Sequence, residues 1–191
     1  DEMNRANIAK VFGELYFLCR WLSNAVGTSK ALSTWRGPAG ARNDFELPGL
    51  AIEAKTTKRV DAIHVIHGLD QLLEPAGGVL LLFALCVREE ASATESLPRL
   101  VSELRTRLAD DADALNLFEM LLYSAGYDDR LEPEYAKLTL RVRSEGLYRV
   151  SDGFPRLIPV SVVGGLPPGV DAVSYELRTD AAVAWMVAGA P

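Results

Sequence analysis

Residues 43–57 read NDFELPGLAIEAKTT, and this stretch decides which fold the rest of the chain is expected to adopt. Pro48 and Gly49 form a turn dipeptide. The turn separates two segments that we predict to be strands, residues 44–47 and 50–56. The stretch therefore predicts a β-hairpin.

The second strand of this hairpin carries charge on only one of its faces. Successive side chains of a strand point to opposite faces, so Glu53 and Lys55 share a face, while the apolar Ile52 and Ala54 belong to the other. The hairpin also brings Asp44 beside Glu53. A strand with an apolar face does not need this set of charges.

The three charged side chains have the chemistry of a metal site that hydrolyses phosphodiesters. Asp44 and Glu53 offer carboxylates, and the Ala54 carbonyl offers a third oxygen ligand for Mg²⁺, with positions left for water. The ammonium of Lys55 would orient the attacking water or help to ionise it. An acid two residues before a lysine is also common on solvated sheet faces, so the residues alone leave both interpretations open.

The composition is that of a soluble globular protein with one sizeable core, or a core with a small appendage. The chain has 191 residues, of which 49% are hydrophobic and 24% charged. The longest apolar run, residues 78–87, is about half the length that crosses a bilayer, which favours a buried strand and no membrane partner. The acidic-polar start does not resemble a signal peptide. We expect a cytoplasmic protein.

Cysteine and histidine usage argues against two common kinds of site. Cys19 and Cys86 stand far apart in apolar surroundings, which is typical of core residues in a reducing compartment, and a disulfide between them is left open. The two histidines, His64 and His67, have no cysteine nearby. A structural zinc site and a Ser-His-Asp hydrolase are therefore poorly supported.

The net charge of −6 argues against a protein that coats nucleic acid generally. The charge is unevenly distributed: residues 30–59 contain six basic and three acidic residues, so this segment carries +3 and the rest of the chain −9. A local positive segment suits a polyanionic substrate that is bound at one place.

Further elements follow from hydrophobic periodicity and turn residues. An apolar stripe predicts a helix over residues 4–25, which ends near Gly27, and places Glu14 at the edge of its buried face. The other expected elements are a helical turn at 29–35, strands at 62–66 and 78–87, helices at 95–110 and 111–127, a hairpin at 137–151 and a strand at 170–179. A weak boundary near residues 128–133 predicts a core at 1–130 and a β-rich C-terminal extension at 131–191, packed on that core.

The spacing of Asp44, eight intervening residues and Glu53-Ala54-Lys55 resembles the active-site motif of the PD-(D/E)XK nuclease superfamily. The chain as a whole resembles bacterial proteins labelled "PD-(D/E)XK motif protein". The segments that carry this resemblance are FGELYFLCRWL, WRGPAGARNDFELPGLAIEAKTT, IHGLDQLLEP, LFEMLLYSAGY, YRVSDGFPRL and LPPGVDAVSYEL. Asn43 stands where the superfamily name has proline, as in many divergent members.

The resemblance implies an α/β fold with a restriction-endonuclease-like core, in which helices flank a central mixed sheet of four or five strands. It implies Mg²⁺- or Mn²⁺-dependent cleavage of DNA in bacterial restriction or phage defence. By the same matching, Glu14 corresponds to a helical acid that supports the metal site, and Gln71 to a glutamine that contacts the site or the substrate. Members usually carry a segment ahead of FGEL, so we expect this chain to be a piece of a longer protein.

DNA is the expected partner. Arg36, Arg42, Lys58 and Arg59 are predicted to contact its phosphates, the alternative being that they solvate their loops. A homodimer would supply two sites for cutting two strands. A helicase or methyltransferase partner is implied only at the level of the family.

Two rival functions stay open at the level of the sequence. One is a DNA-binding or scaffold subunit of a defence complex that keeps the nuclease fold and cuts nothing. The other is a metal-dependent hydrolase of a small phosphorylated substrate, which is less favoured because the chain has no nucleotide-binding Gly-rich loop.

Overall fold

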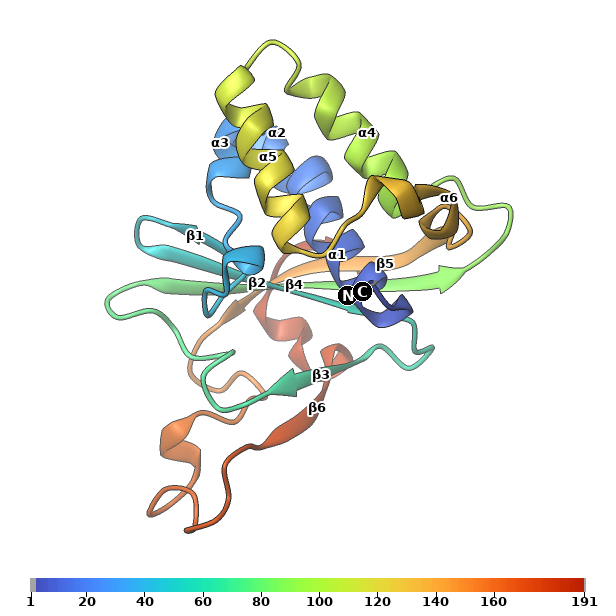
Figure 1. Ribbon diagram of the computed structural model, residues 1–191. Helices are drawn as coiled ribbons and strands as arrows, with labels where there is room; N and C mark the ends of the chain where they lie inside the picture. The colour runs from blue at the N-terminus through green and yellow to red at the C-terminus, as the bar shows by residue number, and fades with distance from the viewer. Residues whose placement is uncertain (1–2, 191) are drawn as a thin grey trace.

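The structure, a computed structural model, describes residues 3–190 and has three layers (Figure 1). A five-stranded mixed sheet lies in the middle, helices cover one of its faces, and a two-stranded sheet lies against the other. The expected α/β class and the mixed sheet flanked by helices are thus confirmed.

The central sheet has the strand order β1-β2-β4-β5-β7. Strands β2 and β4 are parallel, and the other neighbours are antiparallel. Strand β3 pairs with β6 in the small sheet. The bounds are Phe45–Leu47 (β1), Leu50–Thr57 (β2), Ile63–His67 (β3), Val79–Glu89 (β4), Leu140–Val150 (β5), Ser174–Arg178 (β6) and Met186–Ala190 (β7).

The helix layer begins with one continuous helical segment in which α1, a π-helical turn and α2 follow each other directly. Helical bounds are Arg5–Phe17 (α1), Leu18–Leu22 (π turn), Ser23–Val26 (α2), Thr28–Ser33 (α3), Leu97–Arg107 (α4), Ala112–Ser124 (α5) and Glu132–Tyr135 (α6). Short 3₁₀ turns occupy Gly37–Ala39, Asp129–Leu131, Pro159–Ser161 and Thr179–Trp185. No helix within residues 3–190 is long and apolar enough to span a membrane.

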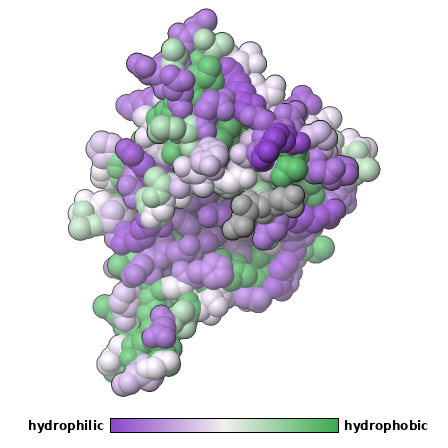
Figure 2. Space-filling view, in the orientation of Figure 1, coloured by the Kyte–Doolittle hydropathy of each residue, from purple (hydrophilic) through white to green (hydrophobic). Residues whose placement is uncertain are grey.

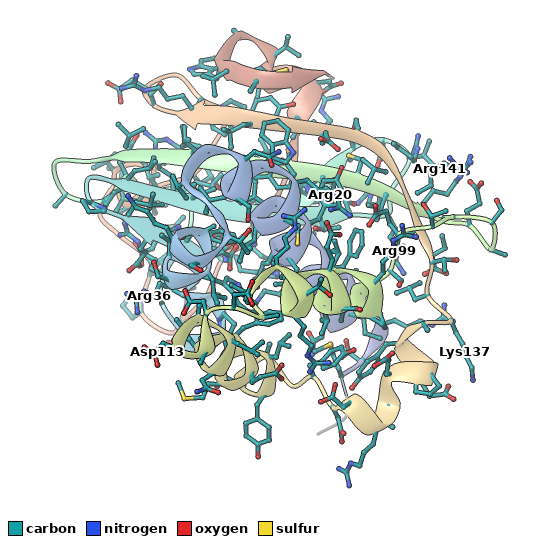
Figure 3. The ribbon with its side chains drawn as sticks, turned by 90° about the horizontal axis from the view of Figure 1, so that it is seen from above. Arg20, Arg36, Arg99, Asp113, Lys137 and Arg141 are labelled. Atoms are coloured by element: carbon teal, nitrogen blue, oxygen red, sulfur yellow. The ribbon has the colours of Figure 1, made fainter. Side chains whose placement is uncertain are left out.

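Local sequence signals explain where the first helical segment begins and ends. The Asn4 side chain accepts a hydrogen bond from the Asn7 N–H and so caps the start of α1. Gly27 ends α2 with a φ of 86°, a conformation that costs glycine little. Arg20, in the π turn, pairs with Glu103 at 2.7 Å and therefore ties this segment to α4 (Figure 3).

The alternation of β2 divides the core into two clusters, as the sequence pattern predicts. Ile52 and Ala54 pack in the larger cluster between the sheet and the helices, together with Trp35 and Phe83. Ala51 packs in the smaller cluster, between the central sheet and the β3–β6 sheet. Cys19 and Cys86 are both buried and free, so no disulfide joins them.

Helix α1 packs so closely on β2 that only glycine fits at position 13. A Cβ atom at Gly13 would lie 1.7 Å from Thr56 Oγ1. We expect Gly13→Ala to destabilise the protein by about 1–3 kcal/mol, because this overlap outweighs the better helix propensity of alanine. Urea unfolding measures this change in the free energy of unfolding. The double variant Gly13→Ala, Thr56→Ala should recover part of the lost stability. A Gly13→Ala variant as stable as the parent would contradict this close packing.

The predicted hairpin at 137–151 is wrong, because residues 140–150 form one uninterrupted strand, β5. Gly146 does not turn the chain but lies in the strand, opposite Ala84 of β4 and Gly189 of β7. A Cβ there would lie 3.1 Å from Met186 Cε. The glycine permits close packing, and pairing on both edges of β5 holds the strand extended.

The strands that follow residue 131 belong to both sheets. Strands β5 and β7 complete the central sheet, and β6 pairs with β3, which lies far earlier in the sequence. The expected strand at 62–66 exists as β3, but it lies outside the central sheet and crosses the opposite face from the helices. This placement encloses the face of β2 that carries Glu53 and Lys55.

Candidate functional site

Asp44 and Glu53 meet where β1 begins. Phe45 lies opposite Ile52 in the antiparallel register, which places the preceding residue, Asp44, next to Glu53. The Asp44 carbonyl accepts hydrogen bonds from the backbone N–H groups of Arg36 and Gly37, which fixes the chain at this point. The hairpin therefore brings the two predicted carboxylates together.

The Asp44 side chain continues the pairing of β2 beyond the end of β1. Asp44 Oδ2 accepts a hydrogen bond of 2.9 Å from the backbone N–H of Ala54. In a strand, the N–H and C=O of one residue point toward the same neighbour. The Ala54 carbonyl is therefore directed to the strand edge at which Asp44 lies, as its predicted role as a ligand requires.

Glu14 reaches the same place from α1 and is buried, with 2% of its surface exposed. Its Oε2 accepts a hydrogen bond of 3.0 Å from Trp35 Nε1, and its Oε1 lies 3.9 Å from Lys10 Nζ. Oε1 has no hydrogen-bond partner within residues 3–190. A buried carboxylate oxygen in this state is costly unless something compensates its charge.

The carboxylates of Glu14 and Asp44 converge over Gly37. A Cβ atom placed on Gly37 would lie 2.8 Å from Asp44 Oδ1, and 3.2 and 3.3 Å from the two oxygens of Glu14. Any larger residue at position 37 would therefore occupy the space onto which these oxygens open. The structure thus brings the predicted helical acid to Asp44.

Glu53 lies on the other side of Asp44 and is also buried, with 3% of its surface exposed. Its Oε1 is 3.5 Å from Lys55 Nζ, and its Oε2 accepts a hydrogen bond of 3.1 Å from Asn43 Nδ2. Burial and the negative charge of Asp44 raise the pKa of Glu53 to about 7, against the opposing effects of Lys55 and Asn43.

The same two causes, burial first and the charge of Asp44 second, raise the pKa of Glu14 well above its ordinary value. Asp44 therefore lies between two carboxylates that its charge makes harder to ionise. A divalent cation held by oxygen ligands at Asp44 would relieve this repulsion and lower the cost of burying the Glu14 carboxylate beside it.

The donor set fits Mg²⁺ or Mn²⁺ better than a softer metal. Within the described part of the chain, no group of three or more His, Cys, Asp or Glu side chains has the arrangement of a complete protein-ligated metal site. A pair of carboxylates with a backbone carbonyl leaves several positions for water and substrate, which suits Mg²⁺. The unpartnered oxygen of Glu14 and the convergence of its carboxylate with that of Asp44 over Gly37 are the observations that favour a cation here.

The raised pKa of Glu53 predicts how stability depends on pH without metal. Between about pH 4.5, the ordinary value, and about pH 7, the Glu53 carboxyl binds more protons in the folded state than in the unfolded state, so its contribution to the free energy of unfolding should fall as pH rises. Glu14 contributes with the same sign, whereas burial lowers the pKa of His64 to about 4 and gives a contribution of the opposite sign. Urea unfolding in EDTA at pH 5, 6, 7 and 8 measures the slope. Glu53→Gln should make the slope of the free energy of unfolding against pH less negative than in the parent, and an unchanged slope in this variant would contradict the assignment.

Gln71 follows β3 and lies at the site, where its groups make two contacts. Its backbone carbonyl accepts a hydrogen bond of 3.2 Å from Asn43 Nδ2, and its side-chain Oε1 accepts one of 2.9 Å from the His67 N–H. The side chain thus stabilises its own loop. Asn43, which sequence reasoning did not place in the site, links this loop to Glu53.

A cavity of about 330 Å³ opens beside these residues, between the start of α1, the end of β2 and β3. Lys55, Gln71 and Ala54 line it, together with Lys10 and His64, which sequence reasoning left out of the site. Hydrophilic residues extend across the recessed middle of the face shown in Figure 2. The spacing of Lys10 and Glu14, one helical turn, was the available signal for Lys10.

The four predicted DNA-contacting residues lie in different surroundings. Arg59 lines the cavity but pairs with Asp61 and Glu176, and Lys58 pairs with Glu89 at 2.7 Å. Arg42 donates to the Leu73 carbonyl. Arg36 is exposed at the edge of the helix layer (Figure 3). Phosphate contact by these residues stays a prediction.

Comparison with known proteins agrees with this geometry. No curated protein and no solved structure gives a significant match. Residues 6–180 match the family described as "Putative PD-(D/E)XK family member, (DUF4420)". Because this match takes in most of the chain, including all of the residues that meet at the site, the protein belongs to that PD-(D/E)XK family.

Proposed function

We propose that the protein is a Mg²⁺- or Mn²⁺-dependent endonuclease that hydrolyses phosphodiester bonds of DNA, acting in bacterial restriction or phage defence. The observation that carries the proposal is the placement of Asp44, Glu53 and Lys55 at one strand edge, with Glu14 buried against Asp44. Membership in a PD-(D/E)XK family supports the same reaction, since nucleases are usual in that superfamily.

Asp44, Glu53 and the Ala54 carbonyl would hold the cation, and Glu14 would support them through Asp44. When bound, the cation would neutralise charge on the phosphodiester and lower the pKa of a water ligand. Asp44 Oδ2 is occupied by the Ala54 N–H, which leaves Oδ1 as the oxygen available to a ligand. Hydrogen bonds from the Ala54 N–H to Asp44 and from Asn43 Nδ2 to Glu53 hold both carboxylates in place before substrate arrives.

Lys55 would act on the attacking water. Its Nζ is 3.5 Å from Glu53 Oε1 and its side chain is 16% exposed, so the ammonium is anchored yet borders the cavity. From there it can donate a hydrogen bond to water in the cavity and favour the ionised form of Glu53. Asn43 holds the second oxygen of Glu53 and keeps that carboxylate in place.

Incubation with supercoiled plasmid DNA tests the proposal. We expect nicked or linear product with Mg²⁺ or Mn²⁺ and none with EDTA. A protein that binds either metal but leaves plasmid, linear and single-stranded DNA intact would contradict a self-sufficient nuclease. That outcome would favour a non-cleaving subunit of a larger complex.

A further inference from the structure

The cavity beside Lys55 has an unusual lining for an acidic protein. Lys10, Lys55 and Arg59 reach it from α1, from β2 and from the loop after β2, and His64 and His67 lie along β3. None of the described residues in this lining is an aspartate or glutamate. In a chain of net charge −6, such a lining selects for an anion.

Two of the three cations, Lys55 and Arg59, are held in place by carboxylates that do not themselves line the cavity. Lys55 Nζ contacts Glu53 Oε1 at 3.5 Å, and Arg59 contacts Glu176 at 2.7 Å. Lys10 is held more loosely, because its Nζ is 3.9 Å from Glu14 Oε1 and its side chain is 63% exposed. Of the three cations, Lys10 therefore has the weakest ion pair to give up when its side chain reorients toward a ligand in the cavity.

His64 supplies an independent sign that a ligand belongs here. It lines the cavity, is 1% exposed, and its Nδ1 has no hydrogen-bond partner within residues 3–190. Its other ring nitrogen, Nε2, lies 3.9 Å from Cys86 Sγ. This contact fits either tautomer of the ring. If Nε2 donates to the sulfur, Nδ1 is an unused acceptor; if the thiol donates to Nε2, the ring proton lies on Nδ1 as an unused donor, and the proposal rests on this second tautomer. An anion's oxygen, directly or through a water, is the acceptor that this donor lacks.

We propose that this cavity is a binding site for one phosphate group, with Lys10 as its adjustable cation and His64 as a buried donor in its wall. At about 330 Å³ it is at the small end of ligand pockets, which suits a phosphate with its attached sugar. Resting on the proposed function, the occupant is the phosphate next to the one that is cleaved. Lys55 lies between the metal site, where the cleaved phosphate would bind, and the cavity, where the neighbouring phosphate would bind.

The test is titration of the full chain with inorganic phosphate in EDTA, so that no metal mediates binding. The chain has only two histidines, which makes their ring ¹⁵N signals assignable with a His67→Gln variant. We expect phosphate to shift the His64 signal. Calorimetry should show binding that Lys10→Gln weakens about tenfold, the effect of one charge-assisted contact. Lys30→Gln, at an exposed helical lysine outside the cavity, is the matched control.

Absence of phosphate binding, an unmoved His64 signal, or equal weakening by Lys30→Gln would overturn the phosphate site. The proposed nuclease activity fails separately. Phosphate binding that depends on Lys10 in a protein that cleaves no DNA would support the site and contradict the activity. Cleavage of DNA by a protein that binds no phosphate in this cavity would support the nuclease activity and contradict the phosphate site.

Discussion

Replacing Asp44 with asparagine is expected to abolish stabilisation of the protein by Mg²⁺. In the parent, Mg²⁺ at one hundred times its dissociation constant should add about 2.7 kcal/mol to the free energy of unfolding. For a chain of this size, that corresponds to about 5–10 °C in melting temperature. Asparagine keeps an oxygen that can accept from the Ala54 N–H, so the variant should fold, but it lacks the charge that the cation needs.

The same substitution should stabilise the metal-free protein at pH 8. The charge of Asp44 raises the pKa values of both Glu14 and Glu53, so its removal lets these buried acids ionise with less repulsion. The melting temperature in EDTA should therefore rise while the response to Mg²⁺ disappears. Glu46→Gln, at an exposed acid of the same hairpin, is the control and should change neither quantity. An Asp44→Asn variant with the full Mg²⁺ response would contradict the assigned ligands.

Replacing Lys55 with alanine is expected to lower the cleavage rate by about 10²–10⁴-fold, the range typical of a positioned acid–base group. The side chain removed is paired with Glu53, with Nζ 3.5 Å from Oε1, and it borders the cavity. Its loss would leave the attacking water unoriented and make Glu53 harder to ionise. The effect should appear in kcat, since Lys55 is expected to act on the reacting water.

The Lys55→Ala variant should nevertheless keep its fold, because the lysine makes one ion pair and contributes little to either core cluster. Circular dichroism and the Mg²⁺-dependent melting temperature check this. Lys137→Ala, which removes an exposed lysine paired with Glu134 far along the chain, is the matched control. Full cleavage by Lys55→Ala would refute the assigned role.

The hairpin and its charges were predictable because they depend on local rules. A Pro-Gly turn fixes the register of two short strands, and the alternation of β2 fixes which side chains share a face. The sequence pattern alone therefore sufficed to predict that Asp44, Glu53 and Lys55 lie close together, as they do in the structure.

The surroundings of these residues depend on long-range packing and were less predictable. Helical geometry placed Glu14 only at the edge of a buried face, whereas its burial against Asp44 requires Gly13 to bring α1 close to β2. The pairing of β3 with β6 joins segments more than one hundred residues apart, and no local signal specifies it.

At two positions, Gly146 and Asn43, the structure uses a residue in a way that the sequence pattern did not indicate. Gly146 resembles a turn residue in the sequence, yet the structure uses it for close contact inside a strand. Asn43 replaces a proline of the superfamily name, and its amide donates both to Glu53 and to the loop at Gln71. Proline has no such donor, so this departure strengthens the connection between the hairpin and the cavity.

Cleavage of supercoiled plasmid DNA in Mg²⁺, by the parent protein and Lys55→Ala side by side, tests the central claim most directly. The account predicts nicked or linear DNA from the parent, none in EDTA, and at least a hundredfold slower reaction for the variant. Equal cleavage by both proteins, or no cleavage by a parent protein that binds Mg²⁺, would contradict it.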